Sequence, residues 1–120
     1  MRTLLAVAGA ALMLATVVRP AGAQQDQAHQ GHELYDKQCK SCHGATGTPP
    51  ARARSQYKKI KAIGEDGFVS ALSADSIVTI LKKGIDKDMK SFASKISESE
   101  MQAVAAYVKE LAEKSKKAGA

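Results

Sequence analysis

The chain has 120 residues, a quarter of which are charged, and a formal net charge of +6 at neutral pH. This length suits one domain and argues against a multidomain protein. Aromatic residues make up only 4% of the chain and tryptophan is absent, so a core built from protein alone would be thin. No array of basic and aromatic residues occurs, which argues against nucleic-acid binding.

The first 23 residues have the pattern of a cleaved secretory signal peptide. Arg2 gives a short positive start, an apolar run covers residues 4–18, and Ala21-Gly22-Ala23 offers a small-residue cleavage site. The apolar run is too short to span a bilayer comfortably, so we expect an exported, periplasmic-type protein without stable membrane insertion. An uncleaved anchor is the alternative. Cleavage after residue 23 removes two arginines and no acidic residue, which lowers the net charge to +4.

The next segments predict a helix that leads into a cysteine motif. Residues 24–30 are rich in glutamine and are expected to form a mobile leader. From residue 31 to residue 39, Leu34, Tyr35 and Gln38 face one side at helical spacing.

The most informative motif is Cys39-Lys40-Ser41-Cys42-His43. A Cys-x-x-Cys-His run is the attachment motif of a covalently bound haem. Residues three apart face the same side of a helical turn, so Cys39 and Cys42 can reach two neighbouring vinyl groups of the porphyrin. His43 follows directly and is placed to be the first axial ligand of the iron. The motif therefore predicts one haem c per chain, which would supply the apolar bulk that the core lacks.

Other roles for the two cysteines are weaker. A thioredoxin-like redox pair needs alternating strands and helices, and no strand rich in valine or isoleucine surrounds the motif. A zinc site would need a fourth ligand, for which only His29 and His32 are left, both in a polar stretch upstream. A structural disulfide would enclose only two residues and would remove little entropy from the unfolded chain.

The segment after the motif predicts a loop and then a short helix. Residues 44–50 contain two glycines and two prolines, a composition typical of loops. Residues 52–63 are basic, and the spacing of Tyr57, Ile60 and Ile63 predicts a short helix that Gly64 would end.

Two further helices have clear start and stop signals. Ser73 is a good N-cap for a helix over residues 74–83, and Gly84 stands where a C-terminal cap belongs. Ser97 and Glu100 have the spacing of a capping box, which predicts the start of a longer last helix.

The last helix is expected to extend to about Lys116 and to present one apolar face. That face consists of Met101, Val104, Val108 and Leu111, with Tyr107 beside it. We expect a single domain over residues 31–113, followed by a frayed basic tail over residues 114–120.

Residues 85–92, between those two helices, predict a loop that offers a second iron ligand. A thioether is a soft ligand that suits the sixth position of a haem iron. Met101 lies on an apolar helix face, where filling the core is the usual role of methionine. Met89 has charged neighbours on both sides and no apolar face to join. We therefore expect Met89 to bind the iron opposite His43; an exposed Met89 without a function is the alternative.

Taken together, these motifs resemble those of a small soluble cytochrome c of class I, of the bacterial periplasmic type. Gly31, Tyr35 and Cys39 match the Gly-x-x-x-aromatic-x-x-x-Cys pattern of that family's first helix. Residues 89–92 are similar to its methionine loop and residues 104–108 to its last helix. The resemblance implies an all-α cytochrome c fold, with three to five helices wrapped around one covalently attached haem and the N- and C-terminal helices crossing.

The resemblance also implies particular contacts. A glycine of the first helix lies under an aromatic residue of the last helix, which implies contact between Gly31 and Tyr107. A proline after the haem motif commonly offers its carbonyl group to the ligand histidine, a role that Pro49 or Pro50 would fill. The family's methionine is often followed by proline, whereas a lysine follows Met89 here, so we expect a less rigid loop.

The ligand set implies electron transfer rather than catalysis. An iron held by both His43 and Met89 has no open position for a substrate, so we expect a carrier that shuttles one electron between redox partner proteins, not an enzyme. If Met89 does not hold the iron, a five-coordinate haem would make the protein a ligand sensor or a minor peroxidase. Ligation by His29 or His32 is a third possibility, disfavoured because both lie shortly before the motif on the expected leader.

Lysines surround the segments expected to expose the haem edge. Lys37 and Lys40 flank the haem motif, and Lys82, Lys83, Lys87 and Lys90 lie around Met89. Such a ring would steer the protein onto acidic docking faces of redox partners. An ordinary solvated surface, partly neutralised by Asp86 and Asp88, is the alternative. A monomer is the default expectation.

Overall fold

The computed structural model describes residues 15–18 and 20–118. Residues 1–14 and 19, most of the expected signal peptide, lie outside the described residues, as do residues 119–120. The helices are α1 (Ala21–Gln38), α2 (Lys40–His43), α3 (Ala51–Gln56), the 3-10 turn η1 (Glu65–Gly67), α4 (Phe68–Ala71), α5 (Ala74–Lys83) and α6 (Glu98–Ala118). Over the described ranges no β-strand forms, which confirms the expected all-α fold. None of the helices in this part of the chain is long and apolar enough to cross a bilayer.

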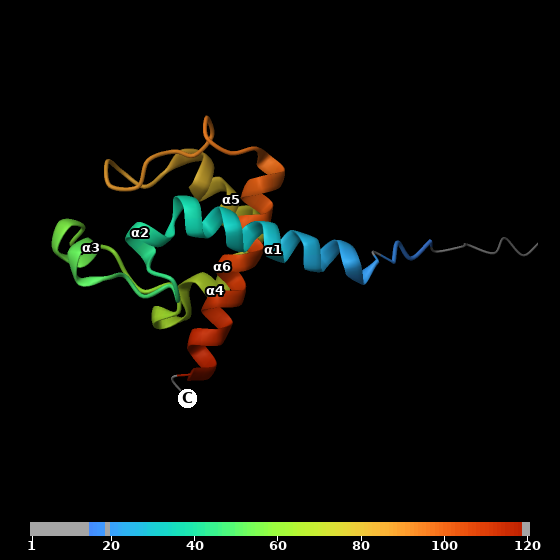
Figure 1. Cartoon of the computed structure of the whole chain (residues 1–120), viewed down its shortest axis with the longest axis horizontal. Coiled ribbons are helices and arrows are strands. Elements are labelled where there is room, and N and C mark those ends of the chain that lie inside the picture. Colours follow the sequence, from blue (N-terminus) through green and yellow to red (C-terminus); the bar gives the residue numbers. More distant parts are fainter. Residues whose placement is uncertain (1–14, 19, 119–120) are drawn as a thin grey trace, which may run out of the picture.

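α1 and α6 cross at close range in the body of the molecule (Figure 1). A Cβ atom on Gly31 would collide with the carbonyl oxygen of Ala103 and would lie 3.1 Å from the Cβ atom of Tyr107. Only glycine lets the two backbones approach this closely. The contact that the resemblance implied between Gly31 and Tyr107 is therefore confirmed.

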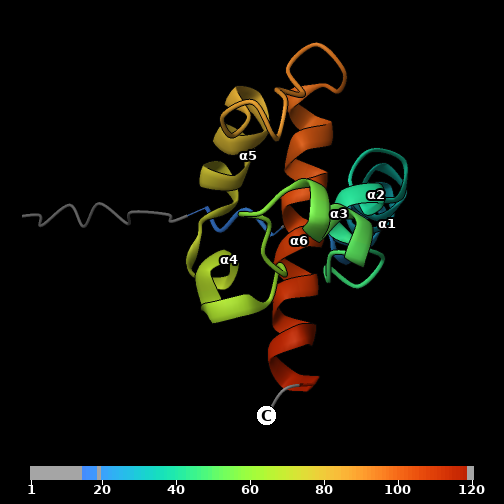
Figure 2. The same cartoon turned by 90° about the vertical axis from the view of Figure 1, so that its left-hand side faces the viewer.

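The core lies along α6, which is placed between α1–α3 on one side and α4 and α5 on the other (Figure 2). At the crossing, the ring of Tyr35 meets the ring of Tyr107 edge to face, with centroids 5.2 Å apart. The remaining large core residues of α5 and α6 are Ile77, Val78, Leu81, Met101, Val104 and Leu111, all of them buried. The apolar face predicted for the last helix is thus the face that packs against the rest of the protein.

Both predicted helix starts are confirmed by their caps. The hydroxyl of Ser73 accepts a hydrogen bond from the backbone N–H of Ser76 at 3.1 Å, and α5 ends at Gly84. The backbone N–H of Ser97 donates to the Glu100 carboxylate at 2.6 Å, and the N–H of Glu100 donates to the Ser97 hydroxyl at 3.2 Å. This reciprocal capping box satisfies two backbone donors that the helix start would otherwise leave without partners.

The ends of the domain are more helical than expected. α1 begins at Ala21, so residues 24–30, expected as a mobile leader, are helical. Polar side-chain contacts between residues four apart accompany both extensions. His29 Nδ1 lies 3.9 Å from a Glu33 carboxylate oxygen in α1, and Lys114 Nζ lies 2.6 Å from Glu110 in α6. α6 continues to Ala118, through most of the tail expected to be frayed.

The short helix predicted over residues 52–63 is wrong in position and length. α3 covers Ala51–Gln56, and the backbone leaves the helical region at Tyr57, which has φ −115° and ψ 92°. The backbone N–H of Ile63 donates to the carbonyl of Gly47 at 2.8 Å, and the Ile63 side chain is buried. This contact with the preceding loop outweighs local helical spacing, and residues 57–64 form turns and irregular backbone instead of a helix.

Candidate functional site

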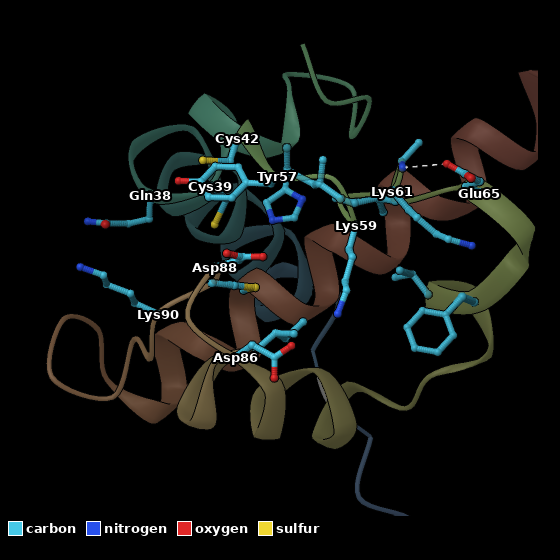
Figure 3. Close-up of a pocket in the computed structure, with 18 of the residues that line it drawn as sticks. Gln38, Cys39, Cys42, Tyr57, Lys59, Lys61, Glu65, Asp86, Asp88 and Lys90 are labelled. Atoms are coloured by element: carbon cyan, nitrogen blue, oxygen red, sulfur yellow. Dashed lines mark hydrogen bonds between the residues drawn. The ribbon is translucent and has the colours of Figure 1, made fainter. Parts of the chain in front are cut away.

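An apolar cavity of about 370 Å³ lies between the cysteine motif, residues 57–69 and the loop over residues 85–92. The four site residues predicted from the sequence, Cys39, Cys42, His43 and Met89, all line it. In Figure 3, Cys39 and Cys42 lie on one side of the cavity and Asp86 and Asp88 lie on the other. The volume falls in the range of about 300–1,000 Å³ that is usual for cofactor sites.

The cysteine motif forms a helical turn that starts where α1 ends. The backbone N–H of His43 donates to the Cys39 carbonyl at 2.9 Å, which places His43 one turn beyond the first cysteine. Both thiols are free of disulfide bonding. Burial and the neighbouring Cys42 raise the pKa of the Cys39 thiol to about 11, so this thiol is protonated at neutral pH.

The imidazole of His43 lines the cavity and is half-buried. Burial lowers the pKa of His43 because a low-dielectric environment disfavours the charged form. Its Nδ1 atom is buried and has no hydrogen-bond partner among the described residues. Buried polar atoms are nearly always paired, so this nitrogen marks a place where a further group belongs.

A hydrogen bond ties the turn after His43 to the core. The hydroxyl of Tyr35, a fully buried residue of α1, donates to the carbonyl of Gly44 at 2.7 Å. Gly44 has φ +78°, and a Cβ atom there would collide with the carbonyl oxygen of Thr48. Gly44, the residue that follows His43, is therefore fixed both by the Tyr35 bond to its carbonyl group and by a backbone conformation that favours glycine.

Met89 lies on a tight loop that begins at the end of α5. The N–H of Ile85 donates to the Met89 carbonyl at 2.7 Å, and the N–H of Met89 donates to the Ile85 carbonyl at 3.1 Å. These two bonds form an isolated antiparallel bridge and close the loop. The side chain of Met89 packs against the core cluster, so it is not the exposed residue of the alternative interpretation.

Neither proline carbonyl supports His43 in the structure, contrary to what the resemblance implied. Arg54 occupies both groups: its Nε donates to the Pro49 carbonyl at 3.0 Å and its backbone N–H donates to the Pro50 carbonyl at 3.1 Å. The position of Arg54 in α3 explains this difference, because the prolines immediately precede that helix and its first turn needs acceptors.

The two upstream histidines lie away from the cavity. His29 is exposed beside Glu33, and His32 stacks on the ring of Tyr107 at a centroid distance of 4.8 Å. Neither lines the cavity, so neither is placed to bind an iron held there. Within the described part of the chain, no group of three or more cysteine, histidine or acidic side chains is arranged to hold a metal ion, which also disfavours the zinc alternative.

One wall of the cavity was not predicted from the sequence. Tyr57, Lys59, Ile60 and Phe68 contribute to this wall. Isoleucines within an otherwise basic segment could have indicated this apolar wall. Their helical spacing was instead interpreted as the face of a short helix. Phe68 is 62% exposed although it borders the cavity, so a bound group would cover a large apolar side chain.

The cavity fits a covalently attached haem. Two free thiols three residues apart, a half-buried imidazole and a thioether all line an apolar space of cofactor size. Fold and site together define a small haem protein of the c type.

The chain belongs to the cytochrome c family. Residues 26–108 match the family described as "Cytochrome C oxidase, cbb3-type, subunit III". A "Cytochrome c6-like" protein of Nostoc sp. is 31% identical over 103 residues, which cover 85% of each chain. The solved structure of the KustC0563 c-type cytochrome superposes with a TM-score of 0.60 at 23% identity, over 68% of this chain and 95% of that one. This last similarity supports the fold, and the family membership implies haem c as the cofactor.

Proposed function

We propose that this protein is an electron carrier that holds a single haem c through Cys39 and Cys42, with His43 and Met89 as axial ligands. The observation that carries the proposal is that all four side chains line one cavity, although Met89 is distant from the motif in sequence. The relative from Nostoc sp. is described as cytochrome c6-like, which supports electron transfer rather than catalysis.

Each residue has a distinct role in this proposal. A bound haem supplies an iron that takes up and releases one electron. Cys39 and Cys42 anchor the porphyrin edge, and His43 is already neutral because of burial, as a metal ligand must be. Met89 provides a soft thioether, which favours the reduced iron and a relatively high reduction potential. The apolar wall excludes water and penalises the additional charge of the oxidised state.

Charge around the cavity determines which partners fit. Lys59, Lys61 and Lys90 border the cavity, together with Asp86 and Asp88. Two of the lysines expected to steer are partly neutralised, because Lys82 pairs with Glu98 at 2.7 Å and Lys40 lies 3.7 Å from Asp36. Steering towards an acidic docking face would then rest on Lys37, Lys83, Lys87 and Lys90. Electron exchange with such a partner should slow as salt rises through the physiological range, and a flat salt profile would contradict steering.

The amino-terminal sequence supports export. An apolar run followed by a small-residue cleavage site precedes the domain, as in exported proteins. Amino-terminal sequencing of the purified protein should begin at or near Gln24, and a protein that retains Met1 would contradict cleavage.

The decisive experiment compares two methionine variants of the holoprotein. Met89→Ala should abolish the long-wavelength sulfur-to-iron absorption band of the oxidised protein. Met101→Ala is the matched control, because it also removes a thioether but from a side chain that is 2% exposed in the core, and it should keep the band. The pigment should also stay with the protein during extraction with acidified acetone. An intact band in Met89→Ala would overturn the ligand assignment.

The five-coordinate alternative gives a different result. A ligand sensor or minor peroxidase needs an open iron position, so its reduced form would bind carbon monoxide rapidly. A carrier with Met89 bound should react slowly with carbon monoxide. The bridge between Ile85 and Met89 favours the carrier, because it fixes the backbone of the ligand residue.

A further inference from the structure

The end of α5 is bound by the segment that follows Met89. The last carbonyl groups of an α-helix have no partner within the helix. In α5, the Leu81 carbonyl accepts a hydrogen bond from the backbone N–H of Phe92 at 2.8 Å. The next carbonyl, that of Lys82, accepts one from the hydroxyl of Ser91 at 2.5 Å. Ser91 and Phe92, which follow Met89 closely in the chain, thus take the place of solvent at the end of α5.

The Ser91 hydroxyl is held in one orientation. While it donates to the Lys82 carbonyl, it also accepts a hydrogen bond from the backbone N–H of Ala93 at 3.2 Å. The acceptor carbonyl belongs to the last turn of α5, so Ser91 connects the methionine loop to that helix.

The loop also approaches the helix end too closely for most residues. Gly84 has φ +74°, and a Cβ atom there would lie 2.8 Å from the backbone nitrogen of Ser91 and would collide with the carbonyl oxygen of Met89. Glycine at this position lets the chain turn back against α5, so that the Ser91 hydroxyl reaches the Lys82 carbonyl.

We infer that Ser91 is a positioning residue that holds Met89 in place for the iron. Met89 lies between two constraints, the bridge to Ile85 on its own backbone and the Ser91 bond two residues later. With both intact, the backbone at Met89 cannot move away from the cavity without breaking the bridge to Ile85 or the Ser91 bond to α5. This inference rests on the proposed function, because it takes Met89 as an iron ligand.

Loss of the Ser91 hydroxyl should allow the loop over residues 85–92 to open more often, which moves Met89 away from the iron. A hydrogen bond of this kind contributes enough free energy to change an opening equilibrium by about fivefold. Added imidazole can bind the oxidised iron only when Met89 has left, so its binding rate measures that opening. Ser91→Ala should therefore bind imidazole about fivefold faster than the unaltered holoprotein.

Two further variants control the experiment. Ser91→Thr keeps a hydroxyl at the same position and should bind imidazole at the original rate. Ser55→Ala removes a similar bond, in which an exposed serine hydroxyl donates to the carbonyl of Arg52 at 2.8 Å in α3, far along the chain from Met89. It should also leave the imidazole rate unchanged. A purely structural role for Ser91 would lower the melting temperature in Ser91→Ala without changing that rate, and this result would overturn the inference.

The failure of this inference can be distinguished from the failure of the proposed function. If the unaltered holoprotein lacks the sulfur-to-iron band, Met89 is not a ligand and both fail. If the band is present and Ser91→Ala binds imidazole at the original rate, only the positioning role of Ser91 is wrong.

Discussion

The helix crossing and the walls of the cavity are stabilised by different interactions. At the crossing of α1 and α6, side chains are buried almost completely: Tyr35 and Ala103 are 0% exposed and Met101 is 2% exposed. The walls over residues 57–69 and 84–92 instead rely on single backbone hydrogen bonds, and many of their side chains are exposed. Apolar burial therefore supplies most of the stability, whereas a few hydrogen bonds position the residues that face the cofactor.

This contrast predicts that changes in the crossing alter stability and leave the iron spectrum intact. The largest effect is expected for Met101→Ala, which removes a core side chain of α6 that is 2% exposed and leaves a cavity in its place. The free energy of unfolding should fall by about 2–5 kcal/mol. Chemical denaturation of the holoprotein measures this, and the sulfur-to-iron band should persist below the transition. A loss below about 1 kcal/mol would show that the crossing is less tightly packed than the structure indicates.

A smaller effect is expected where the two backbones touch. Gly31→Ala adds one methyl group that meets the carbonyl oxygen of Ala103, so the helices must separate slightly. Overpacking of this kind costs about 1–3 kcal/mol, measured by the same denaturation experiment. Gln30→Ala is the control, because Gln30 is an exposed neighbour in the same helix and remains in the protein after the expected cleavage. It should leave stability unchanged or raise it slightly through better helix propensity. Equal effects in the two variants would contradict the close approach.

The smallest effect is expected at the residue that joins the two regions. Tyr35→Phe keeps the ring at the crossing but removes the hydroxyl that donates to the Gly44 carbonyl. Stability should fall by about 1 kcal/mol. Because the lost bond holds Gly44, the residue next to His43, the reduction potential should change as well. If the stability falls by this amount and the reduction potential does not change, Tyr35 stabilises only the helix crossing and has no effect on the site.

The parts of the fold that could be predicted from the sequence depend on local interactions. α5 and the start of α6 follow from Ser73, Gly84, Ser97 and Glu100, whose caps act within four residues. The segment ending at Ile63 could not be predicted, because its conformation depends on a hydrogen bond to Gly47, which lies outside the helical pattern.

The candidate site shows the same division. The cysteine motif is contiguous, and Met89 could be separated from Met101 because only Met101 belongs to an apolar helix face. The expected support for His43 from a proline was wrong, because Arg54 binds the Pro49 carbonyl instead. No sequence pattern indicates this competition. The roles of Ser91 and Tyr35 also depend on partners that are nine residues away in sequence.

The crossing at Gly31 has a consequence for folding. Its two helices lie far apart in the chain, so the contact closes a long loop of polypeptide and cannot form before both helices are present. Folding that depends on such a distant contact is slower than folding from local contacts alone.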